Sequence, residues 1–547
     1  IIFRSPSGVE NNLGSMGTGA GSEWLIRSTG TSPDFFEHTY YINRPNQFKT
    51  RFEFNKLDSK TLRIDVAITN NHPTDDIYQI NLTPLEMVLP KQVTNRTAHI
   101  SPTVNNLAGS PVELFKGEWG SFAIWQNSPS LSTVESYYHP GQTAFPFTFK
   151  NYTTRILGGN SGYKSYEDMI KAGQTKKFSL FLRFGTKDDS VSTLAPDALE
   201  SYRTGYPQLL NWPDRRPIAN WMISEGSKRS DLNPRGYFWE STLDVKNSTK
   251  FRQLATERTN EVISRMNSMF PKPQGIVIWD LEGQEFQHAF TYVGAPNTLP
   301  QLAPEMDATA DGIFSTFRNA GYRVGVTLRP MKFGTGTQLP STCRGGSAYD
   351  FQDKFIKLDA LFPFRGYACS STNTWVVAPA NQPYDQTRTE DDEEILQILR
   401  QRITYAKQRW GATLFYVDSN VWGAGGPVYH TIFRTLATEF PDILLMPEWE
   451  DNFYFGSTAP YNQANMGVYG TNPEAKTLYP DAFSLINVAD ADLNDPTKRS
   501  QVVDRVKNGD ILLFRSWFAS PEIDSIQSIY AEAAAAKARE ADLAPKQ

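Results

Sequence analysis

Eight strand-like segments recur at a regular pitch in the second half of the chain, and helix-like sequence separates most of them. They read PIANWMIS, GIVIWDLE, YRVGVTLRP, ATLFYVDSN, DILLMPEWE, NMGVYGTN, SLINVADAD and DILLFRSWF. Strands that alternate with helices predict a parallel sheet. Eight such units predict a sheet that closes into a (β/α)8 TIM barrel, whose functional residues come from the carboxyl ends of the strands.

The segments between these strands carry the end signals of helices. Residues 389–411 have acids in the first turn, bases in the last turn and Gly411 as the stop, as the helix dipole and the usual caps favour. In residues 247–270 either Asn247 or Ser248 serves as the N-cap. Helices are expected in the same way over 304–321, 426–440 and 495–509.

The first part of the chain has a different pattern. Short runs of alternating apolar and polar residues, such as FKTRFEFNK, TLRIDVAITN and KKFSLFLRFG, lie between clusters of Asn, Gly, Pro and Ser. This pattern predicts an antiparallel β-sandwich. The proline-rich stretch TGYPQLLNWPDRRP then ends it. We therefore expect a β-sandwich domain over 1–205, a catalytic (β/α)8 barrel over 206–525 with a long rim insertion at 331–389, and an Ala- and charge-rich helical tail over 526–547.

Composition excludes several classes of protein. The net charge of -5 and the lack of a Lys/Arg-rich run exclude a nucleic-acid surface. No stretch approaches the roughly 20 continuous apolar residues that a membrane span needs. Because the chain begins with Ile and shows no signal pattern, we expect that a leader has been removed or lies outside this sequence, and that the protein is secreted, periplasmic or at the cell surface. In that setting Cys343 and Cys369 of the insertion either pair as a disulfide or remain free thiols.

Carboxylates follow two strands that are adjacent in the predicted barrel. Asp418 ends the apolar run LFYV, and Glu448 and Glu450 end LLMPEWE with a spacing that puts both on one face. Adjacent strands are about 4.8 Å apart. The two carboxyl groups of a retaining glycosidase are about 5 to 5.5 Å apart. One such acid alone would suggest a rim salt bridge or a helix cap, whereas Asp418 and Glu448 together favour a catalytic pair, and Glu450 is either a sugar ligand or the true acid.

Other polar residues end further strands. Asp280 and Glu282 form a same-face pair after the second strand and are expected to hold substrate hydroxyls or to pair with Arg329. Arg329 ends the third strand and either steadies a carboxylate or makes a structural ion pair. Asp490 ends the seventh strand and is either substrate-facing or structural. Aromatic rings near the strand ends suit sugar faces or rim packing, and we expect substrate contacts from Trp279, Trp422, Trp449 and Trp517.

The sequence predicts neither a metal ion nor a cofactor. His288 and His430 are the only histidines of the barrel half, and neither belongs to a compact metal motif. His288 is the better candidate for a substrate ligand, and His430 is expected to pack inside a helix. The string DADLND lacks the Gly and Glu of a calcium loop, with Asp495 and Gln501 at those positions. No phosphate loop, dinucleotide fingerprint or nucleophile elbow occurs in a suitable context.

With these residues the chain resembles TIM-barrel glycoside hydrolases that have an N-terminal β-sandwich, in particular the retaining α-glycosidase group. That group includes α-galactosidase-like, α-glucosidase-like and α-amylase-like families. The resemblance implies an aspartate nucleophile after strand four, the place of Asp418. The amylase-like families further imply an acid after strand five and a supporting aspartate after strand seven, the places of Glu448 and Asp490. The chain departs from that type at Tyr416, where it would have Arg, and no acid follows strand six as in the α-galactosidase type.

The expected function is therefore hydrolysis of O-glycosidic bonds in an oligosaccharide or polysaccharide. Two carboxylates would perform it by a retaining mechanism, without a cofactor. Two alternatives remain open at this stage. One is an inverting glycosidase or a polysaccharide lyase on the same barrel. The other is a carbohydrate-binding or structural surface protein that kept the barrel without its activity.

Overall fold

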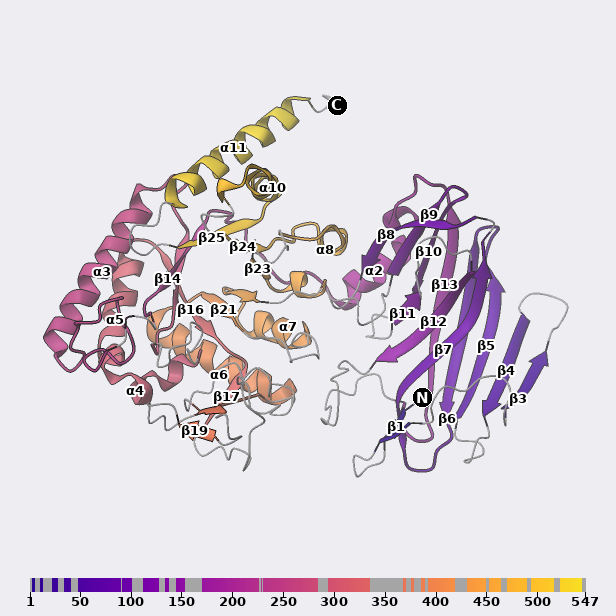
Figure 1. Ribbon diagram of the computed structural model, residues 1–547. Helices are drawn as coiled ribbons and strands as arrows, with labels where there is room; N and C mark the ends of the chain where they lie inside the picture. The colour runs from indigo at the N-terminus through magenta and orange to yellow at the C-terminus, as the bar shows by residue number, and fades with distance from the viewer. Residues whose placement is uncertain are drawn as a thin grey trace.

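In a computed structural model the chain has an all-β part and a barrel part (Figure 1). The residues that the structure describes are 2–4, 10–12, 22–27, 34–40, 48–89, 91–100, 112–126, 133–136, 144–152, 170–225, 228, 230–283, 294–334, 367–369, 375–377, 385–388, 392–418, 430–448, 452–463, 470–488, 493–515 and 522–543.

The N-terminal part consists of two antiparallel sheets. One has the order β11-β12-β7-β1-β2 and the other the order β3-β4-β5-β6-β13-β10-β9-β8. Along the central strand β6, side chains alternate between the core and the surface, and Ile64, Val66 and Ile68 are buried. This confirms the predicted antiparallel sheets, and their stacking as a sandwich stays a prediction.

The strands of the first sheet are β1 (Ile2–Arg4), β2 (Glu10–Asn12), β7 (Asp76–Val88), β11 (Thr133–Ser136) and β12 (Ala144–Tyr152). Those of the second are β3 (Ser22–Arg27), β4 (Asp34–Tyr40), β5 (Phe48–Lys56), β6 (Thr61–Asn70), β8 (Val93–Ile100), β9 (Val112–Gly117), β10 (Gly120–Gln126) and β13 (Thr175–Gly185).

Eight strands of the second part form one parallel sheet, in the order β22-β21-β16-β15-β14-β25-β24-β23. This order is cyclic, since the first strand along the chain pairs with the last. Between β22 and β23, where the circle would close, the N–H of Ala459 donates to the carbonyl of Leu445 at 2.9 Å. The sheet is thus a nearly closed parallel barrel. Its strands are β14 (Ile218–Met222), β15 (Gly275–Trp279), β16 (Arg323–Leu328), β21 (Leu414–Val417), β22 (Leu444–Pro447), β23 (Tyr461–Gln463), β24 (Leu485–Asn487) and β25 (Ile511–Arg515).

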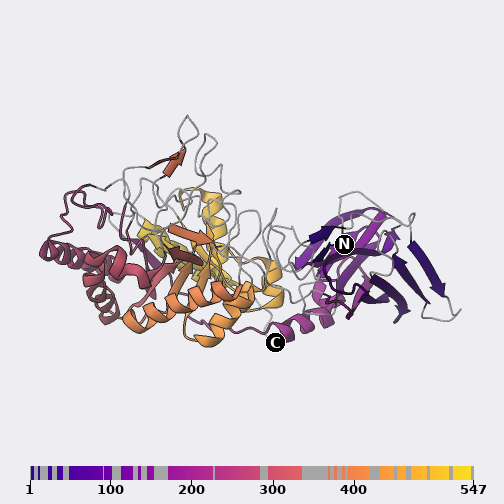
Figure 2. The ribbon, with the colours of Figure 1, turned by 90° about the horizontal axis from the view of Figure 1, so that it is seen from below.

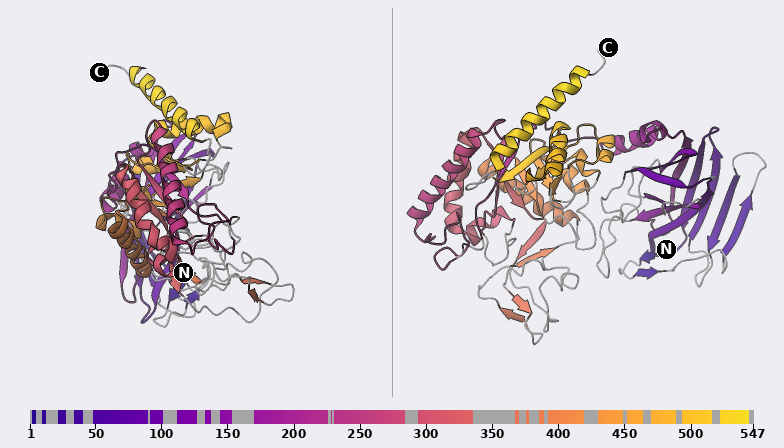
Figure 3. Two further views of the ribbon diagram at one scale, coloured as in Figure 1. Left: turned by 90° about the vertical axis from the view of Figure 1, so that its left-hand side faces the viewer. Right: turned by 45° about the horizontal axis from the view of Figure 1, so that its top comes forward.

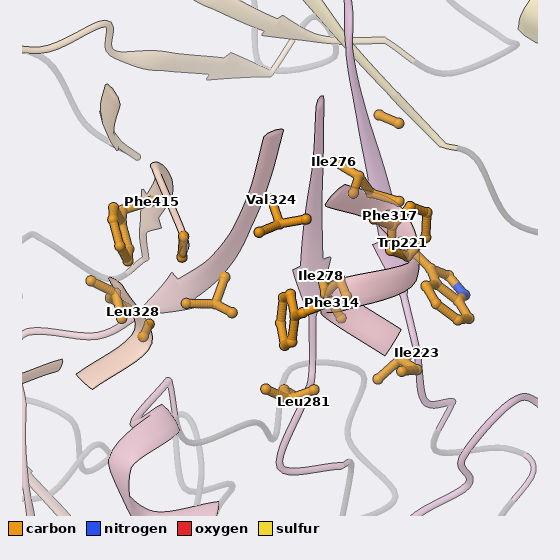
Figure 4. Packing of buried hydrophobic residues seen from close by; sticks show 14 of the residues in the cluster. Trp221, Ile223, Ile276, Ile278, Leu281, Phe314, Phe317, Val324, Leu328 and Phe415 are labelled. Carbon is orange, nitrogen blue, oxygen red and sulfur yellow. The ribbon is translucent and has the colours of Figure 1, made fainter. Parts of the chain in front are cut away.

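Successive side chains along the barrel strands point alternately into the barrel and out toward the helices, so they contribute to two separate buried cores. Val277, Leu414 and Tyr416 belong to the core inside the barrel. The intervening residues, such as Ile276 and Phe415, point outward and pack against the surrounding helices. Figure 4 shows part of this outer core, where Ile276, Ile278 and Val324 of the strands lie near Phe314 and Phe317 of α5. Because burial of each such side chain stabilises the fold by about 1.5 to 3 kcal/mol, the outer core fixes which strand residues face inward.

The helices lie largely where the sequence predicts them. Asn247 caps the first barrel helix, its side chain accepting a hydrogen bond from the N–H of Lys250 at 3.1 Å. Gly321 and Gly411 follow helix ends with positive φ, as expected of helix stops. The helices are α1 (Val191–Leu194), α2 (Pro196–Gly205), α3 (Ser248–Ser268), α4 (Leu299–Leu302), α5 (Pro304–Asn319), α6 (Asp392–Trp410), α7 (His430–Glu439), α8 (Pro473–Leu478), α10 (Pro496–Lys507) and α11 (Glu522–Leu543).

The sixth barrel strand differs from the prediction. The predicted segment NMGVYGTN covers residues 465–472, whereas β23 ends at Gln463. The described end of that segment is used otherwise: Thr471 binds the carboxylate of Asp510, and Asn472 caps α8. Local side-chain hydrogen bonds of this kind compete with strand pairing, and they account for the use of Thr471 and Asn472 outside the barrel strand.

The rim insertion begins and ends in a small antiparallel pair, β17 (Met331–Gly334) with β20 (Asp385–Arg388). Within it β18 (Tyr367–Cys369) pairs with β19 (Trp375–Val377). Cys369 belongs to β18, while Cys343 lies outside the described residues, so the disulfide stays a prediction. Figure 1 shows β17 and β19 beyond one end of the barrel.

One buried cluster joins the all-β part to the barrel part. It contains Trp125 of β10, Tyr202 of α2 and Phe455 near β23, among others. Arg203 of α2 donates to two carbonyl oxygens near the end of α8, at 2.6 and 3.1 Å. Figure 2 shows α2 at the junction between the two parts.

The tail helix α11 lies against α10 and continues past it (Figure 3). Ile526 and Ile529 of its first half are buried in the outer barrel core, and Glu540 near its end pairs with Lys507 at 2.6 Å. Part of the tail therefore acts as a docked barrel helix. None of the described helices is long and apolar enough to cross a bilayer.

Candidate active site

Three charged side chains follow the ends of adjacent strands β16, β21 and β22. They are Arg329, Asp418 and Glu448. The hydrogen-bond ladder continues through them, since the N–H of Asp418 donates to Leu328 at 2.8 Å and that of Glu448 to Val417 at 3.0 Å. Alternation places the three residues in line with the inward-facing positions of their strands. The structure thus brings them together at the mouth of the barrel.

Asp418 is held from two sides. Arg329 Nε donates to its Oδ2 at 2.7 Å, and the hydroxyl of Tyr416 lies 3.3 Å from its Oδ1. The Arg329 side chain is 1% exposed and that of Asp418 is 12% exposed. A buried, charge-assisted hydrogen bond of this kind is shorter and stronger than a neutral one and fixes the direction of the carboxylate. Asp418 is therefore an oriented carboxylate that still reaches solvent.

Stacked aromatic rings lie beneath this carboxylate. Trp279 and Tyr416 stack face to face, with ring centroids 4.8 Å apart and planes 1° apart. Tyr461 contacts the Tyr416 ring at 4.7 Å and 56°. The Trp279 Nε1–H is buried and finds no acceptor among the residues that the structure describes. A buried donor without an acceptor is costly, so this N–H is available to a ligand oxygen or a water molecule.

Asp280 follows Trp279 in an uncommon backbone conformation. Its φ is 58°, and the residue is fully buried. Aspartate is one of the few non-glycine residues that tolerate this left-handed region, yet such a conformation costs about 1 to 3 kcal/mol. The carbonyl of Asp280 accepts from the N–H of Gly283 at 2.7 Å, which closes a turn. The strain lies at the mouth of the barrel, where function rather than packing commonly retains it.

A second row of buried charges lies behind Arg329. Arg402 of α6 donates from Nη1 to the carbonyl oxygens of Gly294, at 3.1 Å, and of Arg329. Glu282 Oε1 accepts from the N–H of Ala295 at 2.7 Å. Burial raises the pKa of Glu282 and lowers that of Arg402 to about 10, and the attraction between the two groups opposes both shifts. Both side chains are thus engaged by the protein itself.

No known family model matches this chain, and no curated protein matches it. Solved structures do show a likeness. They include the α-N-acetylgalactosaminidase NagBb from Bifidobacterium bifidum with GalNAc (10% identity, 94% of this chain and 84% of that chain, TM-score 0.47). They also include a GH31 family sulfoquinovosidase from E. rectale (9% identity, 93% and 73%, TM-score 0.38) and an α-amylase from Geobacillus thermoleovorans (10% identity, 58% and 78%, TM-score 0.30).

These three names are those of glycosidases, the enzyme class that the sequence resembles. No TM-score among the three exceeds 0.47, so the function proposed below rests on the geometry of this chain.

Two residues at the site escaped the sequence reasoning. The resemblance marks Tyr416 only as the position where the amylase type would have Arg, although its two-residue spacing from Asp418 places both on one face. Arg402 lies in α6 between the buried residues Leu399 and Ile403. A charge on the apolar face of a helix was the signal that could have found it, because such a charge is buried only with partners.

Several predicted site residues lie outside the part of the chain that the structure describes. They are His288, Trp422, Trp449, Glu450, Asp490 and Trp517. His430, predicted to pack in a helix, is buried in α7 against Tyr206 and Phe453, with ring centroids 5.0 and 5.2 Å away. Within the described ranges, no group of three or more His, Cys, Asp or Glu is arranged to hold a metal ion.

Proposed function

We propose that this protein is a retaining glycoside hydrolase that cleaves O-glycosidic bonds of an oligosaccharide or polysaccharide on a (β/α)8 barrel. Asp418 is the nucleophile and Glu448 is the general acid and base. The observation that carries this proposal is the placement of the two acids: Asp418, oriented by Arg329, follows β21, and the half-buried Glu448 follows the adjacent strand β22.

The chemistry follows from this pair. Asp418 attacks the anomeric carbon, the glycosidic C–O bond breaks, and the leaving oxygen takes a proton from Glu448. Glu448, now ionised, removes a proton from water, whose oxygen attacks the anomeric carbon and releases Asp418 with net retention. Arg329 suits the first step, since it stabilises the charged carboxylate before attack.

Strand geometry favours retention over inversion. Asp418 and Glu448 follow paired residues Val417 and Pro447 of adjacent strands. Adjacent strands are about 4.8 Å apart, near the roughly 5 to 5.5 Å between the carboxyl groups of retaining enzymes. Inverting enzymes need about 6.5 to 9.5 Å, to leave room for a water molecule.

The sugar would bind across the mouth of the barrel. Two residues at the end of β15, the strand beside β16, support this placement. Trp279 supplies an aromatic ring and a buried N–H, and Asp280 supplies a carboxylate. Arg329 and Glu282, already engaged by the protein, would act on the sugar indirectly. We propose further substrate contacts from residues that the sequence places near the strand ends: His288, Trp422, Trp449, Glu450, Asp490 and Trp517.

We further propose that the chain divides into a β-sandwich domain (1–205), a catalytic barrel (206–525) and a tail (526–547). The protein is exported, and Cys343 and Cys369 form a disulfide. Mass spectrometry of the purified protein with and without reduction would detect that disulfide.

A screen against a panel of glycans and chromogenic glycosides tests the function. The wild type should cleave at least one substrate, while Asp418→Asn and Glu448→Gln should each lose at least about 1000-fold in kcat, since each removes a group that reacts. Asp311→Asn is the matched control, because Asp311 is an exposed carboxylate paired with Arg409 on the outer surface.

Product analysis separates the alternatives. Retention of anomeric configuration in the first product seen by NMR supports the proposal, and inversion overturns the assigned mechanism. An unsaturated product that absorbs in the ultraviolet identifies a lyase. Sugar binding without turnover, unchanged by Asp418→Asn, indicates a binding protein.

A further inference from the structure

We infer that Arg402, on a helix outside the barrel, is a positioning residue for the nucleophile Asp418 and acts on it through Arg329. This inference rests on the proposed function, since it assigns a task within the same site. It concerns a residue that does not touch the substrate.

The first support is a backbone clamp. The Arg402 guanidinium donates to the carbonyl oxygens of Gly294 and Arg329, and the N–H of Arg329 donates to the same Gly294 carbonyl at 3.0 Å. One buried cation therefore ties the end of β16 to the chain that returns before α4. The Arg329 backbone is fixed from both its N–H and its C=O side.

The second support is the close approach at Gly294. Its φ is 61°, and a Cβ built there would lie 2.7 Å from the N of Arg329 and 2.8 Å from its Cγ. No side chain fits in that space without moving Arg329. Glycine is thus required where the loop presses against the residue that orients Asp418.

The third support is the charge balance of the buried row. Glu282 lies beside the two arginines and is itself tied to the loop through the N–H of Ala295. The row therefore holds charges of both signs: Arg402 and Arg329 attract Glu282, Arg329 binds Asp418, and Asp280, two residues before Glu282, is buried as well. Replacing buried ion pairs with well-packed apolar side chains is often neutral or stabilising, so stability alone does not account for this row, whereas orientation of Asp418 does.

The first test compares two arginines of the same helix. Arg402→Met should lower kcat by about 100-fold, as expected when a reacting group is displaced by about 1 Å, and leave KM within about threefold. Arg400→Met is the matched control, since Arg400 makes an exposed ion pair with Glu439 on the outer side of α6. It should keep wild-type kcat. Arg402→Lys should recover part of the loss, because lysine retains the charge and can reach one carbonyl.

The pH profile provides a readout that a general loss of stability would not move. Arg402→Met should shift the acid limb of kcat/KM to higher pH, because a displaced Arg329 stabilises the ionised nucleophile less. Arg329 after β16 and Tyr416 on β21 contact Asp418 directly. The further charged groups at this end of the described barrel are Glu448 after β22, Asp280 and Glu282 after β15, and Arg402 on α6. Gly294→Ala, which keeps all of these charges, should lower kcat in the same way.

A crystal structure of Arg402→Met tests the inference without an activity assay. Loss of the 2.7 Å contact between Arg329 Nε and Asp418 Oδ2 supports the inference. If the variant does not fold, the structure of Gly294→Ala is examined for the same contact. An unchanged contact, or wild-type kcat with an unshifted acid limb, overturns the inference. If the wild type cleaves no glycoside, the proposed function is wrong. In that case the crystal structure of Arg402→Met alone tests whether Arg402 positions Arg329 and Asp418.

Discussion

At the scale of single residues, Tyr416 combines two contacts that are usually separate. Its ring stacks on Trp279 inside the barrel, and its hydroxyl reaches the carboxylate of Asp418. The stack on Trp279 needs only the aromatic ring of Tyr416, whereas its hydroxyl contacts the proposed nucleophile Asp418. A substitution can therefore separate packing from function.

Replacing Tyr416 by Phe should lower kcat by about 10-fold and lower the free energy of unfolding by no more than about 1.5 kcal/mol, because the ring stack is kept. A hydrogen bond to a charged group contributes about 1.5 to 3 kcal/mol, and the 3.3 Å separation favours the lower figure. Tyr322→Phe is the control, since its hydroxyl binds Asn267 away from the site. Equal kcat in wild type and Tyr416→Phe would show that the hydroxyl has no role in the reaction.

His430 is a residue whose burial makes stability depend on pH. Burial, aided by the nearby Arg434, lowers the pKa of His430 to about 3, so the folded protein keeps the ring neutral. The unfolded chain binds a proton near pH 6.5. Between these values the unfolded state holds more protons, so the free energy of unfolding should fall as pH falls, by up to about 1.4 kcal/mol per pH unit.

Urea unfolding of wild type and His430→Phe between pH 4.5 and 7.5 checks this. The variant should lose that part of the pH slope, because its ring cannot be protonated. An identical slope in both proteins would mean that His430 does not carry the effect.

At the scale of elements, most strands and helices followed from periodicity and end signals. β5 and β6 match the predicted runs residue for residue, because one face of each packs on the core and forces alternation. The strand-end rule also placed Arg329 and Asp418 at one site. It could not show that Arg402 joins them, since that contact spans 73 residues and depends on how α6 packs on the barrel.

The N-cap of α3 gives a prediction at this scale. Asn247→Ala should lower the free energy of unfolding by about 1 kcal/mol, because the N–H of Lys250 loses its acceptor. The exposed Asn319 at the end of α5 is the comparison, and Asn319→Ala should change stability by less than about 0.5 kcal/mol. Denaturant unfolding measures both, and equal stability of wild type and Asn247→Ala would contradict the assigned cap.

At the scale of the whole molecule, the cluster between the two parts links their stability. Trp125 is fully buried there, with its ring stacked on Phe181 at 5.2 Å and the guanidinium of Arg183 5.0 Å from its centre. The hydroxyl of Tyr202 on α2 donates to the carbonyl of Gln126, the last residue of β10. Unfolding either part would expose this cluster, so the parts should unfold together.

Calorimetry should accordingly show one main transition. Trp125→Ala should shift that transition as a whole, with a loss of about 3 to 5 kcal/mol, as is usual for a buried tryptophan or phenylalanine. The same variant should keep wild-type kcat, since Trp125 belongs to β10 of the all-β part and makes none of the contacts described for the candidate site. A shift of only one of two resolved transitions would contradict a shared unfolding unit.

The assignment of Asp418 as nucleophile is tested most directly by trapping the covalent intermediate. A 2-deoxy-2-fluoro glycosyl fluoride of the sugar cleaved in the screen would be incubated with the protein, followed by proteolysis and mass spectrometry of the peptides. The account predicts a single glycosyl adduct on the peptide that contains Asp418, absent from Asp418→Asn. An adduct on another carboxylate, or turnover with no adduct, would contradict it.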